Sequence, residues 1–173
     1  MEQEQFVFFW GHERGDYRCF SQWYPCNIYL NDVAFDCAEQ AMMFSKARMF
    51  QDFEIADQIM KTNNPSRQKR LGRKVKNFDD ENWKRVARRI VYVINMAKFT
   101  QNPACLDVIL QTQGTLVEAS PYDKLWGIGL SANEPRALDR NKWLGFNWLG
   151  EVLTEVRNNI QQGKLIQTLC LPF

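Results

Sequence analysis

One segment, Asp36-Cys37-Ala38-Glu39-Gln40-Ala41-Met42-Met43-Phe44-Ser45-Lys46, predicts a helix that is apolar on nearly all sides. A helix of this kind is normally buried. This one nevertheless carries the Glu39 carboxylate and the Lys46 amine, and buried charges must be paired or used in chemistry. The two residues are seven positions apart, which places them on one face of the helix. Their separation of about 10 Å along the axis is too long for an ordinary ion pair, but it can hold part of a sugar.

Simpler interpretations of both residues stay open. Glu39 follows Asp36 by three positions, so Asp36 could cap a helix running to about Phe50 while Glu39 completes a capping box. Lys46 could extend its ammonium group to water. If both are buried, the pKa of Glu39 rises and that of Lys46 falls. A neutral lysine can form a Schiff base, and a protonated glutamic acid can protonate a leaving group.

A second segment, Glu118-Ala119-Ser120-Pro121-Tyr122-Asp123-Lys124-Leu125-Trp126-Gly127-Ile128-Gly129, predicts a loop that lines a ligand site. Its glycines allow close backbone approach. Asp123 supplies a second carboxylate, and Trp126 offers a face on which a base can stack. The alternative is a tight turn whose tryptophan fills the core.

Composition sets the class of protein. The chain has 173 residues, of which 45% are hydrophobic and 24% charged, as in an ordinary soluble protein with a single core. We therefore expect one domain spanning residues 1–173. The net charge of +2 does not demand a nucleic-acid partner. Aromatic residues make up 13%, enough to supply stacking surfaces as well as core.

Helical periods outnumber strand patterns, so we expect a mainly α protein with a small β element, an α+β fold. The expected strands are residues 6–10, 27–30, 33–35 and 115–119, the middle two forming a hairpin. The expected helices are residues 36–50, 52–61, 67–76, 79–101, 103–111 and 147–159, with Asn147 as the cap of the last.

The sequence offers little for a metal or a membrane. The single histidine, His12, and five cysteines without a Cys-x-x-Cys pair make a zinc site improbable, and we expect neither a metal nor another cofactor. The odd cysteine count favours reduced thiols and a cytoplasmic location. No apolar run reaches the ~20 residues that cross a bilayer, so we expect no membrane partner.

Positive charge is concentrated between Lys61 and Arg89, which holds 11 of the 22 basic residues and three acids. Such a run is usually a solvated helix face. Binding of phosphate is the alternative, because arginine grips phosphate oxygens through two bonds at once. Arg70 and Arg73 are the candidates for that role.

Several ordered blocks resemble the NADAR family, typified by the YbiA-type N-glycosidases, over residues of about 20–160. The chain departs from the family pattern at Gln22-Trp23, where Asn-Phe is usual, at Gln40, where His is usual, and at Thr154, where Met is common. The first two departures bear on the substrate more than on the fold. The matching blocks are Phe20-Ser21-x-Trp23-Tyr24-Pro25, Ala38-Glu39-Gln40-Ala41 with Lys46, Arg70-Leu71-Gly72-Arg73, Trp83, Ala97-Lys98-Phe99, Leu116-Val117-Glu118-Ala119-Ser120-Pro121, Asp123, Trp126-Gly127-Ile128-Gly129 and Asn141-x-Trp143-x-Gly145-x-Asn147-x-Leu149-Gly150-x-x-Leu153.

The resemblance implies an N-glycosidase that hydrolyses the bond between a base and a phosphorylated ribose, either ribose 5-phosphate or ADP-ribose. Its partner is then a nucleotide-like small molecule, such as an early riboflavin-pathway intermediate, or an ADP-ribosylated base such as guanine, possibly within DNA. Glu39, Lys46 and Asp123 are the expected catalytic residues. The expected substrate-binding residues are Ser21, Trp23, Gln40, Arg70, Arg73, Trp83, Lys98, Ser120, Trp126, Gly127, Asn141 and Asn147.

Two other classes of function remain open at this stage. A non-catalytic module that binds ADP-ribose or NAD would keep the aromatic and basic residues but would not need Lys46. A nucleic-acid-binding protein would use the basic segment, and its affinity would fall steeply with salt.

Overall fold

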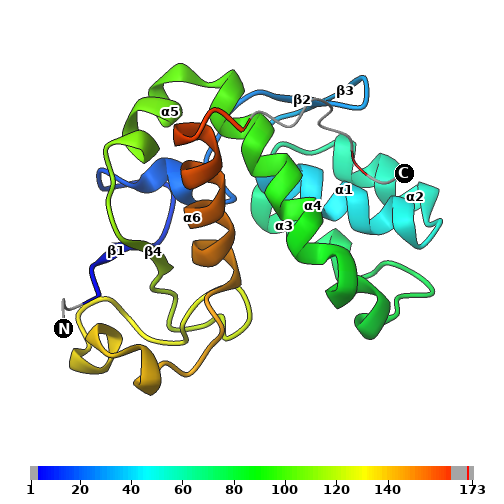
Figure 1. Ribbon diagram of the computed structural model, residues 1–173. Coiled ribbons are helices and arrows are strands. Elements are labelled where there is room, and N and C mark those ends of the chain that lie inside the picture. The colour runs from blue at the N-terminus through cyan, green and yellow to red at the C-terminus, as the bar shows by residue number, and fades with distance from the viewer. Residues whose placement is uncertain (1–3, 165–170, 172–173) are drawn as a thin grey trace. The chain divides into compact units, whose positions relative to one another are not determined.

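The computed structural model describes residues 4–164 and residue 171. Helices make up 51% and strands 9% of the described residues, which confirms the expected mainly α fold with a small β element. Figure 1 shows these helices and strands. The described residues form two compact units. Those within 1–21 and 104–165 form the sheet unit, and those within 22–103 and 166–173 form the helix unit.

The helix unit is built around α1 (Ala38–Met49), which packs against three other helices. A hairpin lies against the longest of these, α4, through strand β2. The two residues of its turn, Asn31 and Asp32, have φ of 51° and 60°, as the tightest hairpin turns require, and the predicted hairpin is confirmed. The other elements are β2 (Ile28–Leu30), β3 (Val33–Phe35), α2 (Phe53–Met60), α3 (Pro65–Gly72) and α4 (Asp80–Gln101).

The start of α1 differs from the prediction. Cys37, not Asp36, is the N-cap, and its Sγ accepts a hydrogen bond from the Gln40 backbone. The amide of Gln40, not the carboxylate of Glu39, reaches back to the Asp36 N–H at 2.9 Å. The capping box is therefore shifted by one residue, because a thiol replaces the oxygen that usually caps a helix.

The basic helix is also corrected. It covers Pro65–Gly72 rather than 67–76, and Pro65 lies in its first turn, where proline is favoured because no backbone N–H is needed. It cannot continue to Lys76, because the backbone N–H of Lys76 donates to the Asp52 carboxylate at 2.8 Å. That same carboxylate caps α2, and Asp79 caps α4, so both of these predicted helix starts are confirmed.

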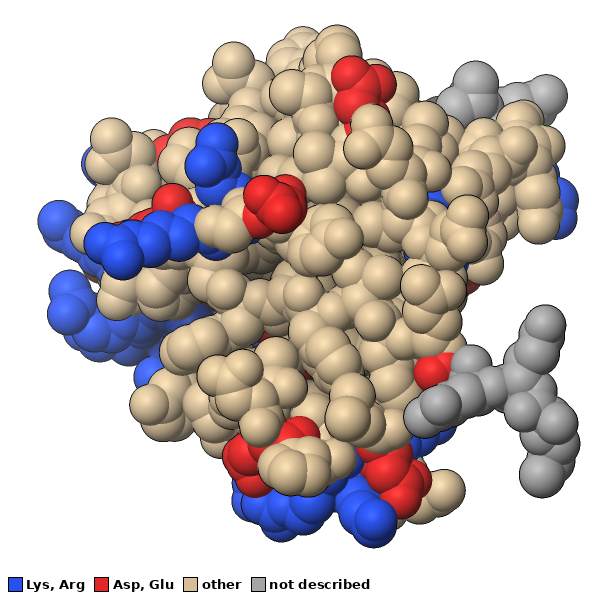
Figure 2. All heavy atoms as spheres, turned by 90° about the vertical axis from the view of Figure 1, so that its left-hand side faces the viewer, with Lys and Arg blue, Asp and Glu red and all other residues tan. Residues whose placement is uncertain are grey.

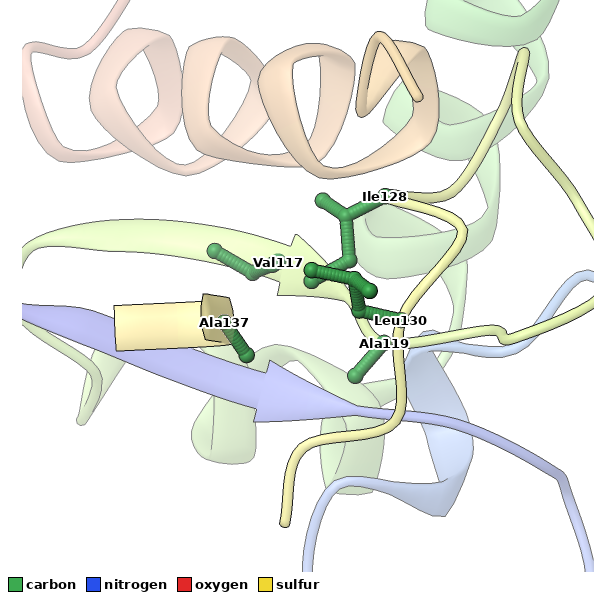
Figure 3. Packing of buried hydrophobic residues seen from close by; sticks show 5 residues of the cluster. All are labelled: Val117, Ala119, Ile128, Leu130 and Ala137. Atoms are coloured by element: carbon green, nitrogen blue, oxygen red, sulfur yellow. The ribbon is translucent and has the colours of Figure 1, made fainter. Parts of the chain in front are cut away.

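The sheet unit holds a pair of parallel strands covered by α6 (Trp148–Gln161). Strand β1 (Phe6–Phe9) pairs with β4 (Thr115–Glu118). Side chains from the segment that follows β4 pack against β4 in a hydrophobic core cluster (Figure 3). The cluster consists of Val117, Ala119, Ile128, Leu130 and Ala137. The remaining elements are η1 (Arg18–Phe20), α5 (Pro103–Leu110), η2 (Pro135–Leu138) and η3 (Arg140–Lys142).

Asn147 precedes α6 as predicted, but its side chain does not cap the helix. Its amide instead bridges β4, accepting from the Glu118 N–H at 2.9 Å and donating to the Leu116 carbonyl at 3.0 Å. Carbonyls of the preceding loop accept the N–H groups of Trp148 and Leu149. The loop thus satisfies backbone N–H groups at the start of the helix, while the Asn147 side chain connects the start of α6 to β4.

Candidate functional site

Lys46 lies on α1 with its amine against aromatic rings. Its Nζ is 3.8 Å from the centroid of the Phe78 ring and 6.0 Å from that of Trp83. Phe78 lies just before α4, and Trp83 is buried in the first turns of that helix. Contact with ring faces suits a cation, but it also removes water from the amine.

Burial lowers the pKa of the Lys46 amine below its ordinary value. Desolvation is the largest cause, since it penalises the ammonium form. Three charged neighbours modify it: Asp80 and Glu39 raise the pKa, while Arg73 lowers it further. The amine therefore lies in a small charged cluster of the helix unit, and the predicted direction of its pKa shift is confirmed.

Removing one of the charges around Lys46 should shift its pKa up or down according to the sign of the charge removed. Arg73→Gln is expected to raise the pKa of Lys46, and Asp80→Asn is expected to lower it further. Only the neutral amine undergoes reductive methylation, so reactivity is lost as the pH falls through the pKa. Peptide mass spectrometry across a pH series measures that midpoint. Glu81→Gln, at the exposed acid beside Asp80, is the control, and equal shifts in both variants would contradict this cluster.

Glu39 occupies the buried first turn of the same helix. Its side chain is 5% exposed, and its backbone N–H donates to the Gln22 carbonyl at 2.9 Å. Gln40 beside it is 3% exposed and directs its amide to the carbonyls of Ile59 and Thr62 and to the backbone of Asp36. Gln40 thus holds the helix start in place, next to the carboxylate.

Asp123 is held in the loop that follows β4 in the sheet unit. Its Oδ1 accepts hydrogen bonds from the backbones of Leu125 at 2.9 Å and Trp126 at 2.8 Å. The Ser120 hydroxyl accepts from the backbones of Tyr122 and Asp123. Within the described part of the chain nothing donates to Asp123 Oδ2, so this half-buried carboxylate is oriented through one oxygen.

The rest of this loop is rigidly fixed. A Cβ on Gly127 would lie 2.9 Å from the Glu118 carbonyl and 3.0 Å from that of Asp123, so only glycine allows this close approach. Trp126 is half-buried and meets the Trp148 ring edge-on, with centroids 5.6 Å apart. The predicted loop is confirmed, and it brings Ser120, Asp123, Trp126 and Gly127 together.

The remaining predicted residues are placed as follows. Lys98 is fully buried on α4, with its Nζ 5.8 Å from the Tyr24 ring centroid. Asn147 is buried in its bonds to β4. Ser21 and Trp23 are half-buried, whereas Arg70, Arg73 and Asn141 are exposed. Their roles toward a substrate stay predictions.

Sequence reasoning missed Phe78 and Asp80 as neighbours of Lys46. The helical spacing of α1 instead predicts Met42, Met43 and Phe50 as the apolar neighbours of the amine. Phe78 is separated from Lys46 by two intervening helices, so no local period signals the contact. The acidic first turn of α4 was recognised, but only as a helix start.

The described residues contain no group of three or more His, Cys, Asp and Glu side chains that could hold a metal ion. The four cysteines among the described residues, at positions 19, 26, 37 and 105, form no disulfide with one another, and Cys170 lies outside the described residues. Over residues 4–164 and 171, no helix is long and apolar enough to cross a membrane. On the face shown in Figure 2, groups of basic side chains lie next to acidic ones in several places.

The family of the chain follows from comparison with known proteins. The model of the NADAR domain matches residues 8–161, and the chain therefore belongs to the NADAR family. This confirms the resemblance found in the sequence.

The chain is similar to two curated relatives and to one solved structure. N-glycosidase R617 of Acanthamoeba polyphaga mimivirus is 42% identical over 170 residues, covering 94% of this chain and 100% of that protein. Protein irg-1 of Caenorhabditis elegans is 39% identical over 158 residues, which cover 82% of this chain and 74% of that protein. The solution structure of Escherichia coli YbiA shares the fold, with a TM-score of 0.75, 23% identity, and coverage of 95% and 89%.

Proposed function

We propose that this protein is an N-glycosidase that hydrolyses the bond between a base and a phosphorylated ribose. Membership of the NADAR family and similarity to a viral relative named an N-glycosidase support this class of enzyme. The observation that carries the proposal is the Lys46 amine, with its pKa lowered by burial on the same helix as the buried Glu39. A lower pKa increases the neutral fraction of an amine at a given pH, and the neutral amine is the nucleophile.

The proposed reaction passes through a Schiff base. Glu39, as a carboxylic acid, protonates the ribose ring oxygen, and the C1–O bond opens as the base nitrogen shares its electron pair with C1. The Lys46 amine adds to C1, and the base leaves with the C1–N electron pair and a proton from the lysine nitrogen. Water then adds to C1 of the protonated imine, and the sugar is released as its aldehyde. The extra proton left on the Lys46 nitrogen returns to the Glu39 carboxylate, which restores the neutral amine and the carboxylic acid. Asp123 is the candidate for orienting a ribose hydroxyl or that water.

The positive charge of Arg73 beside the Lys46 amine favours a substrate that carries a phosphate. Arg73 acts on Lys46 electrostatically, so a phosphate near this cluster would meet the Arg73 guanidinium, and we assign phosphate binding to Arg73 ahead of Arg70. Similarity to a riboflavin biosynthesis protein of Vibrio vulnificus, 24% identical over 160 residues, favours a ribosylamino-pyrimidine phosphate as one substrate. The second substrate that we propose is ADP-ribosylated guanine.

A turnover assay tests the proposed function. Purified protein is incubated with each of the two substrates, and the released base is measured by chromatography. We expect release from at least one, and loss of about 10²-fold or more in Glu39→Gln, which cannot donate the proton. Absence of release from both substrates would contradict the proposal. Binding of ADP-ribose by calorimetry without any turnover would instead favour a binding module.

A further inference from the structure

Two largely exposed aromatic side chains of the sheet unit, Trp10 and Tyr122, contact each other. Tyr122 is 85% exposed and Trp10 is 56% exposed. Their rings contact each other, with centroids 6.0 Å apart and planes tilted by 51°. Large aromatic side chains gain most when buried, so an exposed pair of this kind marks a surface that meets a ligand.

The pair has a defined position in the fold. Trp10 follows the last residue of β1, and Tyr122 lies in the loop after β4. These strands are parallel, and the Ala119 N–H donates to the Phe9 carbonyl at 2.9 Å where they end. Both rings therefore lie at the carboxyl end of the two strands, where the loop that carries Asp123 begins.

Hydrogen bonds within the loop fix the backbone at Tyr122. The backbone of Tyr122 is held by the Ser120 hydroxyl, and the next residue, Asp123, is fixed by its bonds to the Leu125 and Trp126 backbones. Lys124, also exposed, places a cation in the same short segment. Single-stranded nucleic acid is bound by aromatic faces for its bases together with positive charge for its phosphates, and this loop carries residues of both kinds.

We propose that Trp10 and Tyr122 bind a nucleobase that neighbours the modified nucleotide in a single strand. This rests on the proposed function, because it makes the substrate an ADP-ribosylated base within a strand. Exposure favours a neighbouring base over the substrate's own: a ring that is 85% exposed stands out in solvent, whereas the cleaved nucleotide must be shielded from water. The tilt between the rings lets a flat base stack on one of them and touch the other with its edge.

The test compares two substrates in wild type and in the double variant Trp10→Ala/Tyr122→Ala. One substrate is the ADP-ribosylated guanine nucleoside, and the other is the same adduct inside a single-stranded oligonucleotide. We expect kcat/KM to fall about tenfold or more for the oligonucleotide and to stay unchanged for the nucleoside. An equal loss on both substrates would place the pair at the adduct itself, and no loss on either would remove its role. Both results overturn the proposal.

A binding measurement keeps this proposal separate from the proposed function. Fluorescence anisotropy with an unmodified, labelled single-stranded oligonucleotide needs no turnover. The double variant should bind at least about fivefold more weakly, while Phe53→Ala, at an aromatic residue that is 52% exposed, should match wild type. If wild type binds and the variant is unaffected, the stacking site is wrong even if the enzyme is active. If no substrate is cleaved but the variant loses binding, only the proposed reaction fails.

Discussion

Lys46→Met is expected to lower kcat/KM by about 10³-fold or more on a cleaved substrate, while leaving the protein folded. Methionine keeps the length and apolar stem of lysine, so it can occupy the space against Phe78 and Trp83. It removes the nitrogen that the proposed reaction needs for its bond to C1. Steady-state kinetics with the substrate found in the turnover assay measure the loss.

Two further variants make this result specific. Lys46→Arg retains a positive charge for phosphate but cannot form an imine, so its activity should fall nearly as far. Lys61→Met, at an exposed lysine of the helix unit, should behave as wild type. Near-normal activity of Lys46→Arg would show that the charge alone matters. Full activity of Lys46→Met would remove both roles of this residue.

Gly150→Ala is expected to destabilise the protein by about 3 kcal/mol or more. In an open helix this substitution stabilises by up to about 1 kcal/mol, so a large loss reverses the usual sign. A Cβ on Gly150 would lie closer than 3.0 Å to the Leu116 carbonyl and to the Asn147 amide. Neither group can yield easily, because the Asn147 amide and the Leu116 carbonyl are bonded to each other.

Urea unfolding of Gly150→Ala and Glu155→Ala measures this effect. Glu155 is an exposed position of the same helix, so its replacement should change stability by less than about 0.5 kcal/mol. Equal stability of Gly150→Ala and wild type would contradict the close packing of α6 on β4. A loss of activity without a loss of stability would instead point to a direct role of this region in binding.

Local patterns of the sequence were sufficient for most of the helices. The predicted starts of α2 at Asp52 and of α4 at Asp79 are confirmed, and both side chains cap their helices. The start of α1 was placed one residue too early, because capping by the Cys37 thiol is uncommon and Gln40 takes the bond expected for Glu39. Such errors arise where two neighbouring side chains can fill the same role.

Contacts between distant parts of the sequence could not be predicted in the same way. The parallel pairing of β1 with β4 joins segments that are separated by a hairpin and five α-helices, and no periodicity encodes it. Phe78 beside Lys46 is a similar case, since its position depends on how α3 and α4 pack on α1. The candidate residues themselves could be chosen from their chemistry, because a carboxylate and an amine on an apolar helix stand out without any structure.

Reduction by borohydride during turnover tests the central claim, that Lys46 attacks C1 of the ribose, most directly. The substrate is the one that the protein is found to cleave, and the treated protein is digested and analysed by mass spectrometry. We predict a stable adduct with the mass of the sugar phosphate portion on Lys46, and none on Lys46→Met treated identically. Full turnover without an adduct on Lys46 would contradict the claim and favour direct attack by water.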